Sequence, residues 1–296
     1  MKTFSNKLLI ILLFTLILIL LFKNNNIVNL TTIKAIELWK NKLFPSLFIM
    51  FVINDFLINS NTLNYFTNLF NIRNNYIIVL ILSIFSSTPG SSLIIKELYN
   101  KKDLSLISSN KLLMCTYFSN PLFLYTILSS IFTRDLVLII IISHYLSNIV
   151  IFITLVYNKS IYLSSNDYQS NLSNVLLNSI KKAINNMLSI LGIVTFFMII
   201  SNIFISTFIP NENIGIIIKG IFEITQSLSE FNLLNTSEFN KAILSLSIIS
   251  FGGLSIHMQV YNIIKDTPIN YKYFFTGRLY QVLYSLLIFL LIYYIR

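Results

Sequence analysis

The chain has 296 residues, of which 55% are hydrophobic and 11% charged, and its mean hydropathy is +0.75. Soluble domains carry about a quarter of their residues as charges, so this composition excludes a soluble protein and indicates an integral membrane protein embedded in a lipid bilayer. The net charge of +10 comes from basic residues scattered between apolar stretches, so we expect no nucleic-acid partner.

Apolar stretches long enough to cross a hydrocarbon core of about 30 Å recur along almost the whole chain. No room remains for a soluble domain, so we predict a single membrane domain over 1–296. Its fold class is an all-α polytopic membrane protein with about eight transmembrane helices. The expected helices are Leu8–Phe22, Leu43–Ile58, Tyr76–Phe85 with its continuation toward Thr88, Leu112–Phe132, Leu136–Tyr157, Ile184–Ile209, Lys241–Ile263 and Phe274–Tyr294.

The first apolar stretch, Leu8–Phe22, resembles the core of a secretory signal peptide. No small-x-small cleavage site follows it, because Lys23 leads into three asparagines, so we expect a retained first span. From Ile27 to Lys42, apolar residues recur at helical spacing with lysines opposite. This pattern predicts a helix along the membrane interface with Trp39 at headgroup depth.

Two glycine-broken segments interrupt the hydrophobic pattern, near 86–92 and near 250–255. Lipid offers no partner for a freed backbone N–H or C=O, so a break at membrane depth must line a cavity or be buried in protein. One interrupted helix in each half is typical of a transporter's binding site. We therefore expect two pseudo-repeated halves, 1–157 and 158–296, although both segments could be loops at the membrane surface.

The segment Ile214–Phe231 is too polar for a comfortable full span, and we interpret it as a re-entrant or half-length helix. Its polar residues are Lys219, Glu223, Gln226 and Glu230.

The most basic short connection should be cytoplasmic under the positive-inside rule. It contains Lys96, Lys101, Lys102 and Lys111. Counting spans outward from it places Lys34 on the same side and Lys219 on the other side. The N-terminus is then expected outside the cytoplasm.

Two long runs resemble the signatures of a known family. Thr88–Phe123 and Phe251–Leu279 are similar to motifs of the YlbJ-type sporulation integral membrane proteins, within the wider group carrying nucleoside-recognition, or Gate, domains. Two shorter segments, Phe44–Phe48 and Ile221–Gln226, also resemble motifs of this family. The family's first signature usually opens with a glycine-rich break, whereas this chain has only Gly90 there.

The resemblance implies a membrane protein needed in endospore formation, similar to the one assigned to moving dipicolinic acid across the outer forespore membrane. Dipicolinate is a small planar aromatic dicarboxylate, so the expected partner is a small anionic molecule. An assembly protein of the forespore membrane and a nucleoside transporter are the alternatives. The sequence shows no obvious acidic-and-amide cluster for ribose hydroxyls, which argues against nucleosides.

A bound dianion needs hydrogen-bond donors, positive potential and a flat apolar wall. Helices that begin at the breaks supply the first two through free N–H groups and their dipoles. The candidate substrate-binding residues at these starts are Gly90, Ser91, Ser92, Gly252, Gly253 and Ser255. For the serines, ordinary N-capping worth about 1 kcal/mol is an equal alternative.

His257 and Gln259 lie two positions apart on one expected helix, so only one of them can easily face a cavity. His257 could contact a carboxylate or couple protons, or it could simply pack. For His144 we favour a packing role.

Asn120 precedes Pro121, which should break its span and let the amide line a cavity. Arg278 suits bidentate carboxylate binding, and anchoring its span at the cytoplasmic interface is the alternative. Glu97 and Glu223 would repel a dianion, so we assign them to gating, proton coupling or ion pairs.

Searches for enzyme constellations find none, so we expect no catalytic residues and no enzyme activity. Two histidines and the lone Cys115 cannot make a closed four-ligand zinc site, and we expect no metal and no cofactor.

Overall fold

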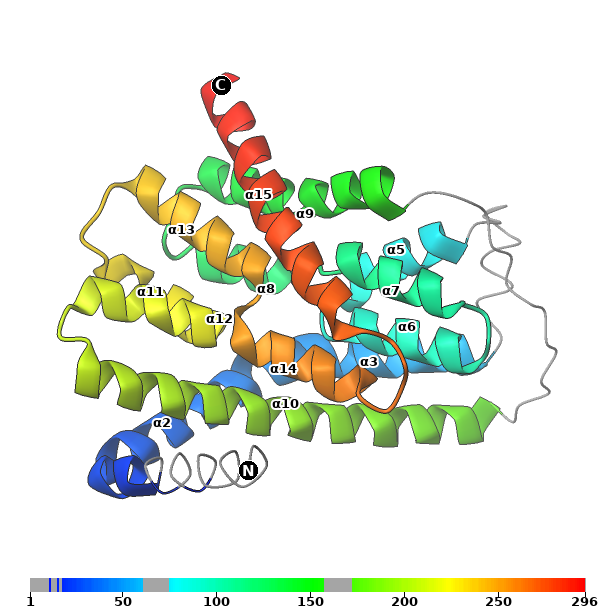
Figure 1. Cartoon of the computed structure of the whole chain (residues 1–296), viewed down its shortest axis with the longest axis horizontal. Coiled ribbons are helices and arrows are strands. Elements are labelled where there is room, and N and C mark those ends of the chain that lie inside the picture. The colour runs from blue at the N-terminus through cyan, green and yellow to red at the C-terminus, as the bar shows by residue number, and fades with distance from the viewer. Residues whose placement is uncertain (1–10, 12–14, 16–17, 61–74, 157–171, 296) are drawn as a thin grey trace, which may run out of the picture.

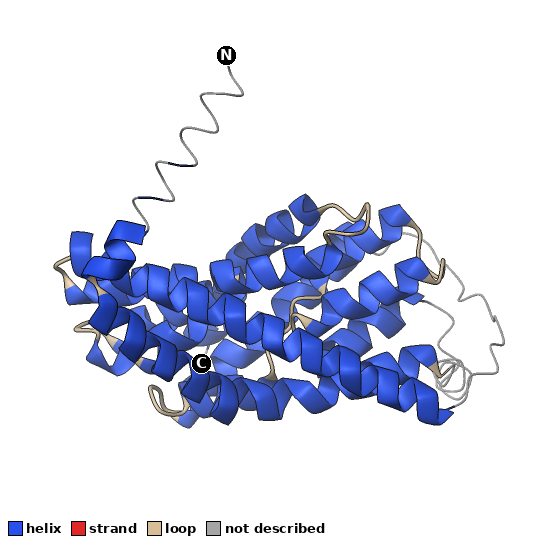
Figure 2. Cartoon of the chain, turned by 90° about the horizontal axis from the view of Figure 1, so that it is seen from below, coloured by secondary structure: helices blue, strands red, loops and turns tan. Residues whose placement is uncertain are grey.

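A computed structural model describes residues 11, 15, 18–60, 75–156 and 172–295. These residues form helices joined by short loops, with no strand among them (Figure 2). The elements are α2 (Asn25–Leu38), η1 (Trp39–Leu43), α3 (Phe44–Asn59), α5 (Asn75–Ser86), α6 (Gly90–Asn100), α7 (Leu106–Cys115), α8 (Pro121–Leu128), α9 (Arg134–Ile151), η2 (Phe152–Val156), α10 (Leu172–Phe208), α11 (Glu212–Phe222), α12 (Ile224–Ser229), η3 (Phe231–Leu233), α13 (Glu238–Phe251), α14 (Gly253–Ile264) and α15 (Tyr271–Ile295).

Two long helices lie against each other along one side of the molecule (Figure 1). One is the continuous run α2–η1–α3, with a π-helical turn at η1 just before Pro45, and the other is α10. With 37 residues at about 1.5 Å each, α10 exceeds the thickness of a hydrocarbon core. We call α2–η1–α3 and α10 the long-helix pair.

The remaining helices are interrupted in a recurring order. α5 and α6 pack side by side and meet at the tip Ser87–Pro89, and the interrupted helix α7/α8 follows them. Later α11 and α12 fold back at Glu223, where Ser227 Oγ donates to the Ile216 carbonyl at 2.7 Å, and the interrupted helix α13/α14 follows. All four interruptions lie near the middle of the molecule (Figure 1).

α15 packs on α9, α13 and α7 and fills the side away from the long-helix pair. Gly277 permits the closest approach, because a Cβ built there would lie 2.6 Å from the Met114 Cα. Backbone contact of this kind is how small residues bring membrane helices together.

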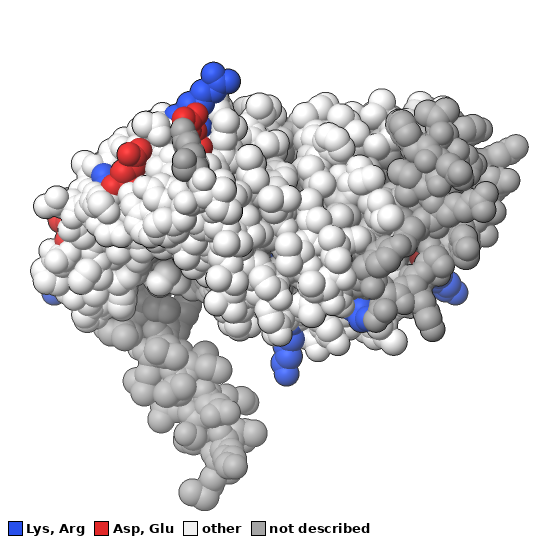
Figure 3. Space-filling view, turned by 90° about the horizontal axis from the view of Figure 1, so that it is seen from above, with Lys and Arg blue, Asp and Glu red and all other residues white. Residues whose placement is uncertain are grey.

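Five helices among the described residues are long and apolar enough to cross a membrane, which confirms an integral membrane protein. They are Asn25–Asn59, Arg134–Leu155, Leu172–Phe208, Glu238–Ile264 and Tyr271–Ile295. One face of the molecule shows a wide uncharged surface with few charged side chains (Figure 3).

Several expected spans take a different form. Leu8–Phe22 lies mostly outside the described residues. The expected span at Tyr76–Phe85 is a shorter apolar helix, Tyr76–Ser86. The span expected at Leu112–Phe132 is interrupted before Pro121, because the chain leaves the helix between Thr116 and Asn120.

The helix expected from Ile27 to Lys42 is present, and its position along the membrane interface stays a prediction. These residues belong to the candidate span Asn25–Asn59, and Trp39 Nε1 donates to the Met187 carbonyl of α10 at 2.9 Å. An apolar helix with one charged stripe packs equally well on a protein neighbour, and α10 provides that neighbour.

The sidedness assigned to Lys34 is contradicted. Lys34 and Lys219 both pair with Glu230, at 3.0 and 2.6 Å, so they lie at the same end of the molecule. Burial raises the pKa of Glu230, but the hydrogen bonds from Lys219 and Lys34 outweigh it and hold that pKa below its ordinary value. Counting spans failed here because the chain turns back at Ser87–Pro89 and at Glu223, and each turn returns it to the side from which it came.

Candidate substrate site

A cavity of about 60 Å³ lies where three of the interruptions and α14 meet the long-helix pair. We call it the central cavity. Its lining residues are Leu43, Ser46, Leu47, Ser87, Thr88, Pro89, Ser119, Asn120, Phe123, Leu124, Ile190, Val194, Glu223, Ile224, Thr225, Ile256 and Gln259. Both tips, the α7/α8 interruption and α14 therefore contribute to one space.

The tip between α5 and α6 is fixed to the α7/α8 interruption. The Thr88 amide donates to the Phe118 carbonyl at 2.8 Å, so two irregular segments satisfy each other's backbone. Ser91 and Ser92 are buried and bond locally, with Ser92 Oγ donating to the Pro89 carbonyl at 2.6 Å. Neither serine lines the central cavity, and Gly90 lines a neighbouring cavity described below.

Asn120 ends the α7/α8 interruption, as its place before Pro121 predicts. Its Oδ1 accepts from the Leu122 and Phe123 amides at 2.9 and 3.2 Å and caps α8. Its Nδ2 donates to the Ser46 carbonyl at 3.5 Å across the central cavity. The side chain thus links an interrupted helix to the long-helix pair.

Glu223 forms the second tip and is almost fully buried. Its carboxylate accepts from the Thr225 amide at 2.8 Å and from the Gln226 amide at 3.5 Å, which caps α12. The sequence indicated a re-entrant segment here but not the tip itself. A carboxylate two and three residues before backbone donors is the capping signal that could have found it.

The break at Gly252 matches the sequence prediction in place. Gly252 ends α13 with φ +99°, and Gly253 begins α14 with φ +62°, conformations that favour glycine. A Cβ at Gly252 would lie 3.1 Å from Tyr117 Oη, and one at Gly253 would lie 3.3 Å from the Gly220 carbonyl. These glycines and the buried Ser255 pack against protein and do not line the central cavity.

Of the two polar residues on α14, Gln259 lines the central cavity and His257 does not. His257 packs between Phe251, whose carbonyl lies 3.0 Å from Nε2, and Tyr271, whose hydroxyl lies 2.6 Å from Nδ1. The helical spacing of these two positions explains why only one reaches the space.

Arg278 lies away from the central cavity and is fully buried beneath the α7/α8 interruption. It donates to the Met114 carbonyl at 2.8 Å and to Gln281, and its guanidinium lies 4.3 Å from the Tyr117 ring centre. The expected placement at a membrane interface is therefore wrong. A cation at the last carbonyls of α7 is stabilised by the helix dipole.

His144 completes the support of the same interruption. Its Nε2 lies 3.3 Å from the donating Ser119 amide, and Asn148 Nδ2 donates to the Tyr117 carbonyl. Tyr145 Oη donates to the Ser119 carbonyl at 2.7 Å. Side chains of α9 and α15 thus satisfy a backbone that has left the helix, and no sequence pattern indicates this network.

Glu97 is in an ion pair, one of the roles expected for it. Its carboxylate and that of Asp55 lie 3.0 and 2.9 Å from Lys182 Nζ, which joins α6, α3 and α10. The Glu97 carboxylate does not line the central cavity.

Three helix starts contribute positive partial charge to the central cavity. α6, α8 and α12 begin at or directly after residues that line it, and helix N-termini carry positive partial charge. Asn120 and Glu223 cap α8 and α12, whereas α6 and α14 have no side-chain cap. The lining contains one carboxylate and no lysine or arginine.

The chain is similar to the sporulation integral membrane protein YlbJ of Bacillus subtilis (strain 168), with 21% identity. The similarity covers 85% of this chain and 74% of the relative. No protein-family model matches the chain, and no solved structure is similar to it. The relative confirms the resemblance to the YlbJ-type sporulation integral membrane proteins that the two long motifs carry.

Proposed function

We propose that this chain is a transporter, rather than an enzyme, that moves a small organic anion across a membrane during sporulation, with dipicolinate as the substrate. The observation that carries the proposal is the central cavity, where three helix interruptions and α14 face the long-helix pair. Irregular backbone at membrane depth is tolerated where it lines a cavity or is buried, and substrate sites use such interruptions. The sporulation name of the B. subtilis relative supports the context, and the outer forespore membrane is the proposed location.

The start of α6 supplies the attraction for a carboxylate, because the helix begins directly after the cavity-lining Pro89 and directs the positive end of its dipole toward the central cavity. Glu223 would repel a dianion, so it must carry a proton when the substrate is bound. A protonated Glu223 can donate a hydrogen bond to the substrate. Transport is then coupled to protonation of this residue.

The central cavity is small, since ligand sites usually occupy about 300 Å³ or more and this cavity occupies about 60 Å³. The present conformation is therefore closed, and substrate enters when the interrupted helices shift against the long-helix pair. We propose that α5–α9 and α11–α15 are two repeats that carry this movement, because tip, interrupted helix and uninterrupted helix occur twice in the same order.

A nucleoside is the second candidate substrate. The sequence shows no obvious acidic-and-amide cluster, which argued against a nucleoside. In the structure, however, Glu223, Asn120 and Gln259 line one cavity. A carboxylate with two amides matches the hydroxyl groups of a ribose, and it needs no proton to do so.

Uptake by the purified chain in liposomes tests both candidates. Labelled dipicolinate and labelled uridine are offered separately, each with the other as unlabelled competitor, and empty liposomes are the control. We expect saturable dipicolinate uptake that uridine does not inhibit. Saturable uridine uptake without dipicolinate uptake would transfer the assignment to nucleosides, and uptake of neither would end the transport proposal.

A further inference from the structure

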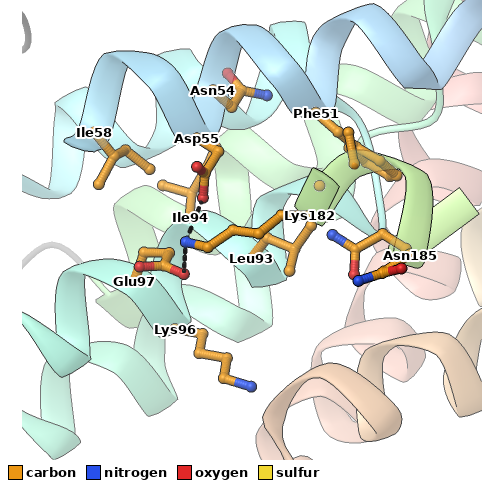
Figure 4. A pocket seen from close by; sticks show the side chains of 13 residues that line it. Phe51, Asn54, Asp55, Ile58, Leu93, Ile94, Lys96, Glu97, Lys182 and Asn185 are labelled. Carbon is orange, nitrogen blue, oxygen red and sulfur yellow. Dashed lines mark hydrogen bonds and ion pairs between the residues drawn. The ribbon is translucent and has the colours of Figure 1, made fainter. Parts of the chain in front are cut away.

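A second cavity of about 290 Å³ lies between α3, α6 and α10 (Figure 4). We call it the side cavity. Its polar lining includes Asp55, Glu97, Lys182, Asn185 and Asn186, and Phe51 contributes an aromatic wall. This volume approaches that of known small-molecule sites, whereas the central cavity does not.

Both cavities lie on the same faces of the long-helix pair. On α10, Lys182 and Asn186 line the side cavity, and Ile190 and Val194 continue at four-residue spacing into the central cavity. Residues four apart lie on one helix face, so a single stripe of α10 borders both spaces.

The α2–η1–α3 run repeats this arrangement. Asp55 and Phe51 line the side cavity, and Leu47 and Leu43 line the central cavity. The two cavities therefore follow one another along the contact between α2–η1–α3 and α10.

Phe51 lies at the boundary between the side cavity and the central cavity. Its ring packs against Gly90, where a built Cβ would lie 3.1 Å from Phe51 Cε1. Gly90 lines the side cavity, while Pro89, directly before it, lines the central cavity. A Cβ at this position would force the ring to move by a few tenths of an ångström, so Gly90 favours the close contact of the ring with the tip of α5 and α6.

Lys182 and Lys96 are the lysines that line the side cavity, and the Lys96 ammonium donates to the Ile263 carbonyl at 2.7 Å. The Lys182 ammonium reaches between Asp55 and Glu97, at 2.9 and 3.0 Å (Figure 4). An ammonium has three donors, so one stays available for a ligand, and 46% of the side chain is exposed. The amides of Asn185 and Asn186 offer further donors beside it.

We propose that the side cavity is the outer station of the transport route, where Lys182 receives the carboxylate of a small aromatic acid, and that Phe51 against Gly90 is the gate to the central cavity. This inference deepens the proposed function and rests on it for the class of ligand. The gate itself rests on geometry alone.

Thiol accessibility in full-length protein in lipid nanodiscs tests the gate. In a Cys115→Ser background, Asn186→Cys places a thiol in the side cavity and Ser46→Cys places one in the central cavity. We expect an anionic methanethiosulfonate to label the first quickly and the second slowly. Adding Phe51→Ala should raise the rate at position 46 by about tenfold or more, because a closed site is open in a minor population only.

Phe48→Ala is the matched control, since Phe48 stacks on Phe44 at 4.9 Å and lines neither cavity. Phe51→Leu serves as a second gate variant if Phe51→Ala does not yield folded protein. An unchanged rate at position 46, or an equal increase with Phe48→Ala, would overturn the gate. These outcomes do not depend on which substrate is transported.

Protection by dipicolinate tests the ligand class. We expect dipicolinate to slow labelling of Asn186→Cys, and Lys182→Gln to abolish this protection while Lys181→Gln on the exposed neighbour preserves it. Equal protection in both variants, or no protection in an Asn186→Cys protein that keeps Lys182 and still transports dipicolinate, would remove Lys182 as the receptor. Loss of transport itself would instead count against the proposed function.

Discussion

Arg278 places a full positive charge inside the protein with no acidic partner among its described contacts. Its neighbours are the Met114 carbonyl, Gln281 and the faces of Tyr117 and Phe274. Backbone carbonyls freed at the end of α7 stand in for a carboxylate. The residue thus stabilises an interruption rather than binding substrate from this position.

Replacing Arg278 by Ala should destabilise the protein by about 2–3 kcal/mol, because the charged hydrogen bonds are lost and buried acceptors stay unpaired. Thermal unfolding of the purified protein in detergent measures this. Arg134→Ala, at an exposed position, is the control and should change little. Equal losses in both variants would contradict the assigned role.

Replacing Glu223 by Gln should remove the pH dependence of dipicolinate uptake. The side-chain carbonyl of Gln can still accept from the Thr225 amide, so α12 keeps its cap. In the unsubstituted protein uptake should fall as pH rises, because the substrate needs a protonated carboxyl. Uptake by liposomes across the neutral pH range measures both profiles, and parallel profiles would exclude Glu223 from coupling.

At this scale the sequence predicted some placements and missed others. The adjacent proline predicted that Asn120 lines a cavity. Helical spacing predicted that only one of the two polar residues of α14 faces the cavity. Spacing could not choose Gln259 over His257, because the choice depends on Tyr271, from a different helix. Ser91, Ser92 and Arg278 were misplaced because local pattern does not show which tertiary neighbour satisfies a polar group.

At the scale of elements, glycines set how closely helices approach. Gly277 of α15 faces the α7 backbone, whereas Gly192 of α10 has no heavy atom within 4 Å of a built Cβ. The two residues have the same chemistry and helical setting, and they differ only in their neighbours.

Gly277→Ala should therefore destabilise the protein, since the new methyl group collides with backbone that cannot move aside as a side chain could. Gly192→Ala should leave stability unchanged or raise it by up to about 1 kcal/mol, because Ala is the better helix former. Melting temperatures of the two variants measured side by side check this. A larger loss for Gly192→Ala would contradict the packing described here.

The breaks at 86–92 and 250–255 were visible in the sequence because proline and glycine mark them. The tip at Glu223 has no proline or glycine between α11 and α12, so only the polar character of the segment indicated it. At Thr116–Asn120 the adjacent proline predicted that the span breaks or kinks, but it did not predict the length of the interruption. Its extent depends on support from α9 and α15, which no local pattern contains.

At the scale of the whole molecule, the tips change the sidedness obtained by counting spans. A helix pair that returns to its own side adds two apolar segments without crossing the membrane. The positions of Lys34 and Lys219 beside one carboxylate follow from this.

Single cysteines in the Cys115→Ser background should reveal this arrangement. Asn235→Cys and Asp266→Cys flank the candidate span Glu238–Ile264 and should be labelled from opposite sides. Lys102→Cys should share the side of Asp266, because Lys96 Nζ donates to the Ile263 carbonyl at 2.7 Å. Labelling with an impermeant reagent in oriented vesicles decides this, and one side for all three positions would refute the arrangement.

The one tryptophan of the chain also makes the molecule its own optical probe. Trp39 sits in η1, with its indole N–H on the Met187 carbonyl of α10 and its ring centre 5.0 Å from that of Phe44. That turn ends at Leu43, which lines the central cavity. A shift of η1 against α10 would break the indole hydrogen bond and move the fluorescence emission, so ligand titrations and opening rates can be read from the unlabelled protein.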